Sequence, residues 1–283
     1  KNLDGIADVK LRNAQRLRLM DRARKLSLDI RTVDPKHPSD EKGGKLERVA
    51  QEVARIYKDW TKDLGTQLVF LDRSVPHSKG DDAQLKAYDK LVAEKDTAMA
   101  KNDEDAYREA VESLEKFDPD EIAELRSAKA GGWNAYQQIK DNLIAQGIPA
   151  REIRFIQEAN TDAQKQAIFD GVKDGSIRVL IGSTPRMGAG TNVQNRLVGL
   201  HHVDVGWKPS DIEQREGRII RQENELYGKY GKAFEVEILS YATETTSDAS
   251  MWALNSMKLK TINGIRKYDG SFTMDFEDED SLS

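Results

Sequence analysis

The sequence predicts an α/β protein built around a doubly wound parallel sheet, with a helical extension before the sheet and a helical hairpin inserted into it. Two observations support this prediction. Short apolar runs alternate with longer amphipathic segments from residue 133 onward, the order typical of strands and helices in a parallel sheet. The run 67–72 is almost wholly apolar, as expected for a central strand covered on both faces.

The helical extension is predicted to span residues 1–64. Apolar residues recur at three- and four-residue steps over 3–30, which indicates one helix, and the prolines within 34–38 end it. A second helix is expected at roughly 45–63. Within residues 1–30, eight Lys and Arg residues stand against four Asp residues. This basic surface is either an ordinary solvated helix face or a patch that faces phosphates.

Residues 81–130 are predicted to form the inserted hairpin. The stretch 81–129 holds eight basic and fifteen acidic residues and no strand-like run. Two apolar stripes are expected to pair, and they consist of Leu85, Tyr88, Leu91 and Val92 on one helix and Tyr107, Val111 and Leu114 on the other. The negative charge argues against direct DNA wrapping. Docking of a protein partner and a simple spacer both remain open as roles of the hairpin.

The sheet domain is assigned to 65–80 and 131–265. Beyond the strand at 67–72, strands are expected at 153–157, 178–183, near 200–205 and at 234–241, and helices at 133–146, 163–173, 209–222 and 246–265. Thr161 and Asp162 cap one of these helices, and Gly175 follows it. Five acidic residues between 275 and 280 predict a disordered tail over 266–283.

Composition excludes several classes of protein and site. The absence of cysteine rules out disulfides, thiolate metal sites and cysteine nucleophiles, and the four histidines argue against a histidine-rich metal site, so none is assigned. No apolar run is long enough to span a membrane, and no basic-then-apolar leader is present; a cytoplasmic protein is therefore expected. The formal net charge of −5 excludes a uniformly basic nucleic-acid coat.

The first candidate functional segment is the glycine-rich stretch 183–192, which follows an apolar strand and precedes a short helix. In an open parallel sheet, ligands lie at the carboxyl ends of the strands. Glycines let the backbone approach a phosphate, and hydroxyls and amides supply donors. By itself the signal is weak, because many strand-to-helix loops contain Gly-Ala-Gly and bind nothing.

The second segment is 214–222, Gln-Arg-Glu-Gly-Arg-Ile-Ile-Arg-Gln. Arg218 and Arg221 are three residues apart, so on a helix they share one face, whereas Arg215 does not fall on the same line. Paired guanidiniums with Gln214 one turn earlier suit a polyphosphate. The alternative is a surface helix whose arginines pair with neighbouring glutamates. Both segments are expected at one exposed edge of the sheet.

Together, the order and spacing of the two segments resemble the second RecA-like lobe of superfamily-two helicases and translocases, in particular the Swi/Snf-type branch. The loop 183–193 is similar to motif V, and Trp207, Pro209 and the stretch 214–222 are similar to the block leading into motif VI. The resemblance covers about 45–78 and 131–245. The amino-acid sequence of these segments is most similar to that of the helicase portion of the large methylase–helicase proteins of phages and mobile elements.

The resemblance implies a site for ATP and for the phosphate backbone of DNA. It implies an arginine finger at Arg221 and a γ-phosphate contact at Arg218, with Gln214 positioning water or phosphate. It also implies nucleotide coupling through Gly188, Gly190 and Asn192, and nucleic-acid contacts through Ser183, Thr184, Arg186 and Thr191. Mg²⁺ and the remainder of the ATP site would come from a first lobe in the same full-length chain.

Three departures from the family pattern bear on function. Met187 and Gly217 replace residues usual in the Swi/Snf branch, and the insertion at 81–130 is unusual in its position. The chain also contains no phosphate loop and no acidic box, so we expect it to be inactive as an ATPase alone. Two alternatives remain: a catalytically inactive helicase-like lobe that acts as a scaffold, and a nucleotide-binding module with unrelated chemistry.

Overall fold

The computed structural model describes residues 9–38, 43–77, 79–117, 122, 125–126, 128–188, 192–206, 208–219 and 223–266. Within them, five parallel strands form one sheet in the order β2-β3-β1-β4-β5. The strands are β1 (Thr66–Phe70), β2 (Ile153–Phe155), β3 (Val179–Gly182), β4 (Leu197–His202) and β5 (Glu237–Ser240). The predicted central strand is confirmed, because β1 lies between β3 and β4 and is buried along its whole length.

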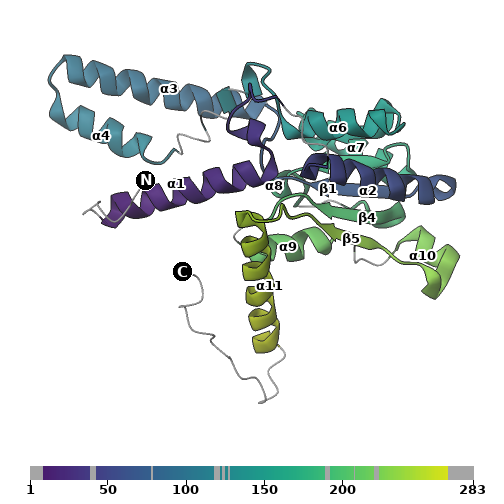
Figure 1. The fold of residues 1–283 in the computed structure, drawn as a ribbon. Helices are drawn as coiled ribbons and strands as arrows, with labels where there is room; N and C mark the ends of the chain where they lie inside the picture. The colour runs from purple at the N-terminus through teal and green to yellow at the C-terminus, as the bar shows by residue number, and fades with distance from the viewer. Residues whose placement is uncertain are drawn as a thin grey trace.

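Helices cover both faces of this sheet (Figure 1). The helices of the described residues are α1 (Val9–Leu28), α2 (Lys45–Asp59), α3 (Lys79–Ala100), α4 (Glu104–Leu114), α6 (Ala135–Ala145), α7 (Asp162–Asp174), α8 (Thr184–Gly188), α9 (Pro209–Glu216), α10 (Glu225–Tyr230) and α11 (Ser247–Arg266). Alternate residues of β1 face opposite cores. Val69 packs with α2 and α6, whereas Leu68 packs with α7. The fold is therefore the predicted doubly wound α/β class.

Local signals explain where several elements begin and end. The Thr161 side chain accepts a hydrogen bond from the Gln164 amide at the start of α7, and Gly175 ends that helix at a φ of 83°, a conformation that glycine adopts without strain. The helix expected over 209–222 is shorter than predicted. It ends at Glu216, because Gly217 has low helix propensity and a turn follows.

Other boundaries also differ from the sequence prediction. The strand expected near 200–205 runs from Leu197 to His202, because its pairing with β1 begins at Leu197. The helix α10 was not predicted; its six residues contain a glycine and give no long periodic pattern. Of the tail expected over 266–283, Arg266 belongs to α11, and residues 267–283 lie outside the described residues.

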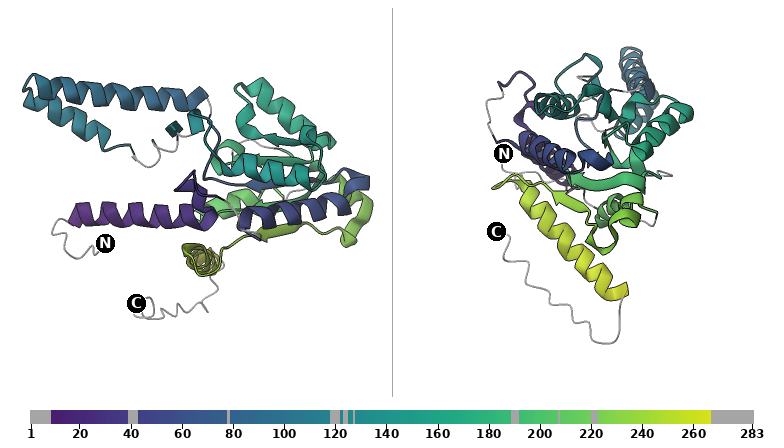
Figure 2. Two further views of the ribbon diagram at one scale, coloured as in Figure 1. Left: turned by 45° about the horizontal axis from the view of Figure 1, so that its top comes forward. Right: turned by 90° about the vertical axis from the view of Figure 1, so that its right-hand side faces the viewer.

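The helices α3 and α4 form a hairpin that projects away from the sheet (Figures 1 and 2). Leu85, Ala98 and Ala110 are buried, and Tyr88 meets the Phe117 ring edge to face at 5.6 Å. Tyr107, which was expected to pair with α3, remains 40% exposed. The small side chains of Ala98 and Ala110 let the helices approach at that level, so the larger tyrosine is not needed in their contact.

A buried hydrogen-bonded chain links the central strands. Gln67 donates from Nε2 to the Val53 carbonyl at 2.9 Å, which leaves its Oε1, 2.9 Å from His201 Nε2, as the acceptor. His201 Nδ1 then accepts from the Tyr241 hydroxyl at 2.7 Å. Burial lowers the pKa of His201 to about 3, so the imidazole is held neutral in the folded protein.

The unfolding free energy should therefore fall as the pH is lowered from about 6.5 to about 3. Over this range His201 becomes protonated in the unfolded state but stays neutral in the folded state. The full shift corresponds to at most about 5 kcal/mol. Urea denaturation at several pH values would measure the slope. In a His201→Gln variant this part of the slope should vanish; an unchanged slope would assign the acid sensitivity to other groups.

Within the part of the chain that the structure describes, none of the helices combines the length and the apolar character needed to cross a bilayer.

Candidate functional site

Four polar side chains meet at the carboxyl edge of the sheet. Asp72, Thr184 and Asp204 follow the ends of β1, β3 and β4, and Arg215 reaches them from α9. Because neighbouring parallel strands end at the same edge, residues more than a hundred positions apart in sequence come together there. We call these four residues the arginine clamp.

Arg215 makes the central contacts of the arginine clamp. Its Nε donates to the Thr184 hydroxyl at 2.7 Å, and its Nη2 donates to Asp72 Oδ2 at 2.6 Å and to Asp204 Oδ1 at 3.3 Å. Nη1 donates to the Asp204 carbonyl at 2.7 Å. The guanidinium also lies 5.3 Å from the centre of the Phe70 ring. A planar fork of donors suits this arrangement, which lysine could not reproduce.

The two carboxylates are also held by backbone and hydroxyl donors. Asp72 accepts from the Thr184 amide at 2.6 Å and from the Thr184 hydroxyl at 2.9 Å. Asp204 Oδ2 accepts from the amides of Asp72 and Arg73 at 2.9 and 3.0 Å. The arginine clamp thus fixes the loop after β1, the loop after β3 and the start of α9 relative to one another.

Burial sets the electrostatics of the arginine clamp. Arg215 is only 1% exposed. Burial alone would lower its pKa, but Asp204 and Asp72 outweigh that effect, so the pKa of Arg215 is raised. For Asp204, burial and the nearby Asp72 raise the pKa, and Arg215 only partly offsets them. Arg215 is therefore a permanent cation that keeps two closely spaced carboxylates compatible with folding.

The structure brings the two segments predicted from sequence into direct contact. Thr184 opens α8, and its hydroxyl bonds to Arg215 of α9. Both Ser183 and Thr184 are buried. The hydroxyl proton and the amide of Thr184 are directed at Asp72, so its contacts in this arrangement are internal to the arginine clamp.

The remaining predicted site residues divide into three groups. Arg186 is half-buried on α8, and Gly188 is the last residue of that helix. Asn192 and Gln214 are exposed. Gly190, Thr191 and Arg221 lie outside the described residues.

Arg218 departs from the sequence expectation. It was expected on an exposed helical face, but it lies in the turn after α9 and is only 9% exposed. Its amide donates to the Arg215 carbonyl at 3.1 Å. The next residue, Ile219, packs in the core with α7 and β1, which draws the turn against the sheet. Arg218 is nevertheless next to the arginine clamp, at the carboxyl edge.

Sequence reasoning missed Asp204 and Arg215. Helical periodicity separates Arg215 from the face that Arg218 and Arg221 would share, so it favours the other two arginines. The strand expected near 200–205 includes Asp204, whereas the observed strand ends at His202 and leaves Asp204 in the loop after it. The available signal was the carboxylate that follows each apolar strand, at Asp72 and again at Asp204.

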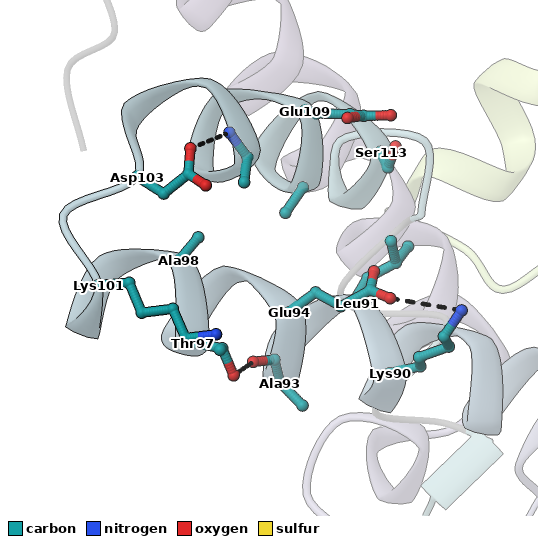
Figure 3. A pocket seen from close by; sticks show the side chains of 12 residues that line it. Lys90, Leu91, Ala93, Glu94, Thr97, Ala98, Lys101, Asp103, Glu109 and Ser113 are labelled. Atoms are coloured by element: carbon teal, nitrogen blue, oxygen red, sulfur yellow. Dashed lines mark hydrogen bonds and ion pairs between the residues drawn. The ribbon is translucent and has the colours of Figure 1, made fainter.

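The cavity within the α3–α4 hairpin is separate from the arginine clamp, because none of the clamp residues lines it. A cavity of about 650 Å³ lies within the α3–α4 hairpin, away from the strands (Figure 3). Its lining includes small residues, an ion pair between Lys90 and Glu94 at 3.3 Å, and the N-cap Asp103 of α4. Within the described residues, no group of three or more His, Asp or Glu side chains is placed to hold a metal ion.

No family model matches this chain, and no curated protein matches it. Among solved structures, it is similar to the one titled "Crystal structure of the C-terminal part of Fun30 ATPase domain", with 14% sequence identity, 86% of each chain covered and a TM-score of 0.34.

Proposed function

We propose that this chain is the second RecA-like motor lobe of an ATP-driven helicase or translocase that acts on DNA. The observation that supports the proposal is the bond between Thr184 and Arg215, at 2.7 Å. It joins the segment that resembles motif V to the segment that resembles motif VI, at the edge of the sheet where ligands of open parallel sheets lie.

The nucleotide-facing residues in this proposal follow the arginine clamp along the chain. Arg218 contacts the γ-phosphate, and Arg221 acts as the arginine finger that stabilises charge during phosphoryl transfer. Gln214, which is exposed one turn before Arg218, orients water or the γ-phosphate. Guanidinium and amide donors of this kind fit a polyphosphate. When bound, ATP supplies the phosphoryl group, with Mg²⁺ held through the first lobe.

The nucleic-acid side of the proposal uses the loop after β3. Arg186, half-buried on α8, and Thr191 contact strand phosphates, whereas Ser183 and Thr184 shape the loop from within. Gly188, Gly190 and Asn192 connect this loop to the nucleotide. Such contacts position the lobe on the backbone without reading sequence.

The arginine clamp gives this arrangement a mechanical role. It ties the loop after β3 to α9 through Thr184 and Arg215, which are both buried. A displacement of Arg218 and Arg221 by nucleotide is therefore transmitted to α8 and its nucleic-acid contacts. A scaffold with no nucleotide chemistry has no need of this connection, although the α3–α4 hairpin remains available for a protein partner in either case.

Purified alone, the chain should hydrolyse ATP negligibly, because it contains no phosphate loop or acidic box. In a two-lobed protein that joins it to a first lobe, DNA should stimulate hydrolysis. A coupled assay of phosphate release, with and without DNA, measures both forms. Robust hydrolysis by the chain alone, or tight nucleotide binding by it, would favour a self-contained nucleotide-binding module and would contradict the proposal.

A further inference from the structure

The helix α1 is anchored by contacts to the same loops that contribute Asp72 and Asp204 to the arginine clamp. Its Asp21 pairs with Arg73 at 2.5 Å, and its Arg24 donates to the Val205 carbonyl at 2.5 Å. Arg73 and Val205 directly follow the clamp residues Asp72 and Asp204. Near its end, the Ser27 hydroxyl lies 3.1 Å from that of Ser247 in α11. From this base, α1 projects away from the sheet (Figures 1 and 2).

The charge of α1 is opposite to that of the chain as a whole. Between residues 9 and 28, seven basic residues stand against a single acidic one, whereas the whole chain carries a formal charge of −5. The acidic residue, Asp21, is engaged by Arg73 and Lys25. Most of the positive charge of α1 is therefore not neutralised by carboxylates of the same helix.

Four arginines of α1 lie outside the contacts that anchor it. Arg12 and Arg16 are four residues apart, as are Arg18 and Arg22, so they make two short rows along the helix. Arg16, Arg18 and Arg22 are exposed and Arg12 is half-buried. Within the part of the chain that the structure describes, none of the four is within ion-pair distance of a carboxylate.

The spacing of the two rows suits a polyanion. From Arg12 to Arg22 the helix rises about 15 Å. A nucleic-acid strand presents a phosphate about every 3.4 Å along a duplex axis, so this stretch of α1 is as long as roughly four phosphates. Arginine keeps its charge and offers several donors to phosphate oxygens. The base of α1 also contacts Arg73, the neighbour of Asp72, and Asp72 bonds to Thr184 in the loop that the proposed function places on a strand.

We propose that α1 is a phosphate-binding arm, in which Arg12, Arg16, Arg18 and Arg22 hold the backbone of a DNA strand and extend the contact surface of α8 beyond the sheet. This inference rests on the proposed function for the position of the strand. Leu19 and Leu26 lie between the two arginine rows and are 48% and 46% exposed; a protein partner of α1 is the alternative that the experiment separates.

The test uses the 283-residue chain and a fluorescein-labelled DNA duplex of about 30 base pairs, with anisotropy measured over a range of salt concentrations. Combined Arg16→Glu, Arg18→Glu and Arg22→Glu substitutions should weaken binding by more than about tenfold and reduce the magnitude of the salt slope by about three. The matched control replaces three exposed basic residues of the hairpin with glutamate, at Lys86, Lys101 and Arg108. This control should leave the affinity for DNA within about twofold of the wild type.

Circular dichroism and thermal melting would establish that both triple variants remain folded. Equal affinity of the α1 variant and the wild type, or failure of the wild-type chain to bind DNA, would overturn the arm and favour a protein partner for α1. An Arg186→Ala variant separates the two proposals. If Arg186→Ala weakens DNA binding and the α1 variant does not, the proposed function is supported and the arm is contradicted. If the α1 variant weakens binding and Arg186→Ala does not, the arm is supported and the contact assigned to Arg186 is contradicted.

Discussion

Replacing Arg215 with alanine should destabilise the protein by about 3–5 kcal/mol, because the substitution removes the only clamp cation and leaves Asp72 and Asp204 facing each other at a buried edge. Urea denaturation followed by circular dichroism would measure the loss. The arginine clamp predicts this large effect for one substitution on a short helix, where an exposed arginine would change stability by less than about 0.5 kcal/mol.

The destabilisation should depend on pH in a defined direction. The pKa of Asp204 is already raised above its usual 3.8 by burial and by Asp72, and removal of Arg215 raises it further. Above 3.8 and up to the raised pKa, the folded state binds the proton more tightly than the unfolded state, so stability falls as the pH rises. The deficit of the Arg215→Ala variant should therefore be larger at neutral pH than at mildly acidic pH.

A double substitution tests whether the charge imbalance is the cause. Adding Asp204→Asn to Arg215→Ala removes one of the two carboxylates and should recover part of the lost stability. Arg151→Ala is the matched control, because Arg151 is largely exposed beside Glu152 at the start of β2, away from the arginine clamp. If the double variant is no more stable than Arg215→Ala, packing around Phe70, and not charge, is what Arg215 supplies.

Replacing Arg221 with alanine in the two-lobed protein should lower the rate of ATP turnover by about 10³–10⁵, with little change in nucleotide affinity. The physical reason is that the charge of an arginine finger is needed mainly when negative charge moves during phosphoryl transfer. Steady-state hydrolysis measures kcat, and equilibrium binding of a non-hydrolysable ATP analogue measures affinity.

Two comparisons make the Arg221 result specific. The Arg151→Ala control should leave turnover and affinity unchanged, and an Arg221→Lys variant should recover only a small part of the rate, because lysine is a point charge without the forked donors of a guanidinium. A loss of affinity as large as the loss of kcat would indicate uniform ground-state binding, which contradicts the role of an arginine finger.

The sequence by itself determined the class of the fold. Alternation of apolar runs and amphipathic segments predicted the parallel sheet, and the apolar run ending at Asp72 predicted its central strand, because burial on both faces requires apolar residues at every position. Local capping chemistry at Thr161 and Gly175 depends only on neighbouring residues, and the structure confirms both. The segment around Thr184 was also recognisable because it follows an apolar strand, and the segment around Gln214 because of its spaced arginines.

Only the tertiary structure decided how those segments are connected. Arg215 has no sequence neighbour that marks it as buried, and its partners Asp72, Thr184 and Asp204 come from three different loops. Helical periodicity assigns an arginine to the solvent by default, since an unpaired buried charge is prohibitively costly. The exception arises where parallel strands end side by side and bring their carboxylates to one cation, an arrangement that depends on strand order.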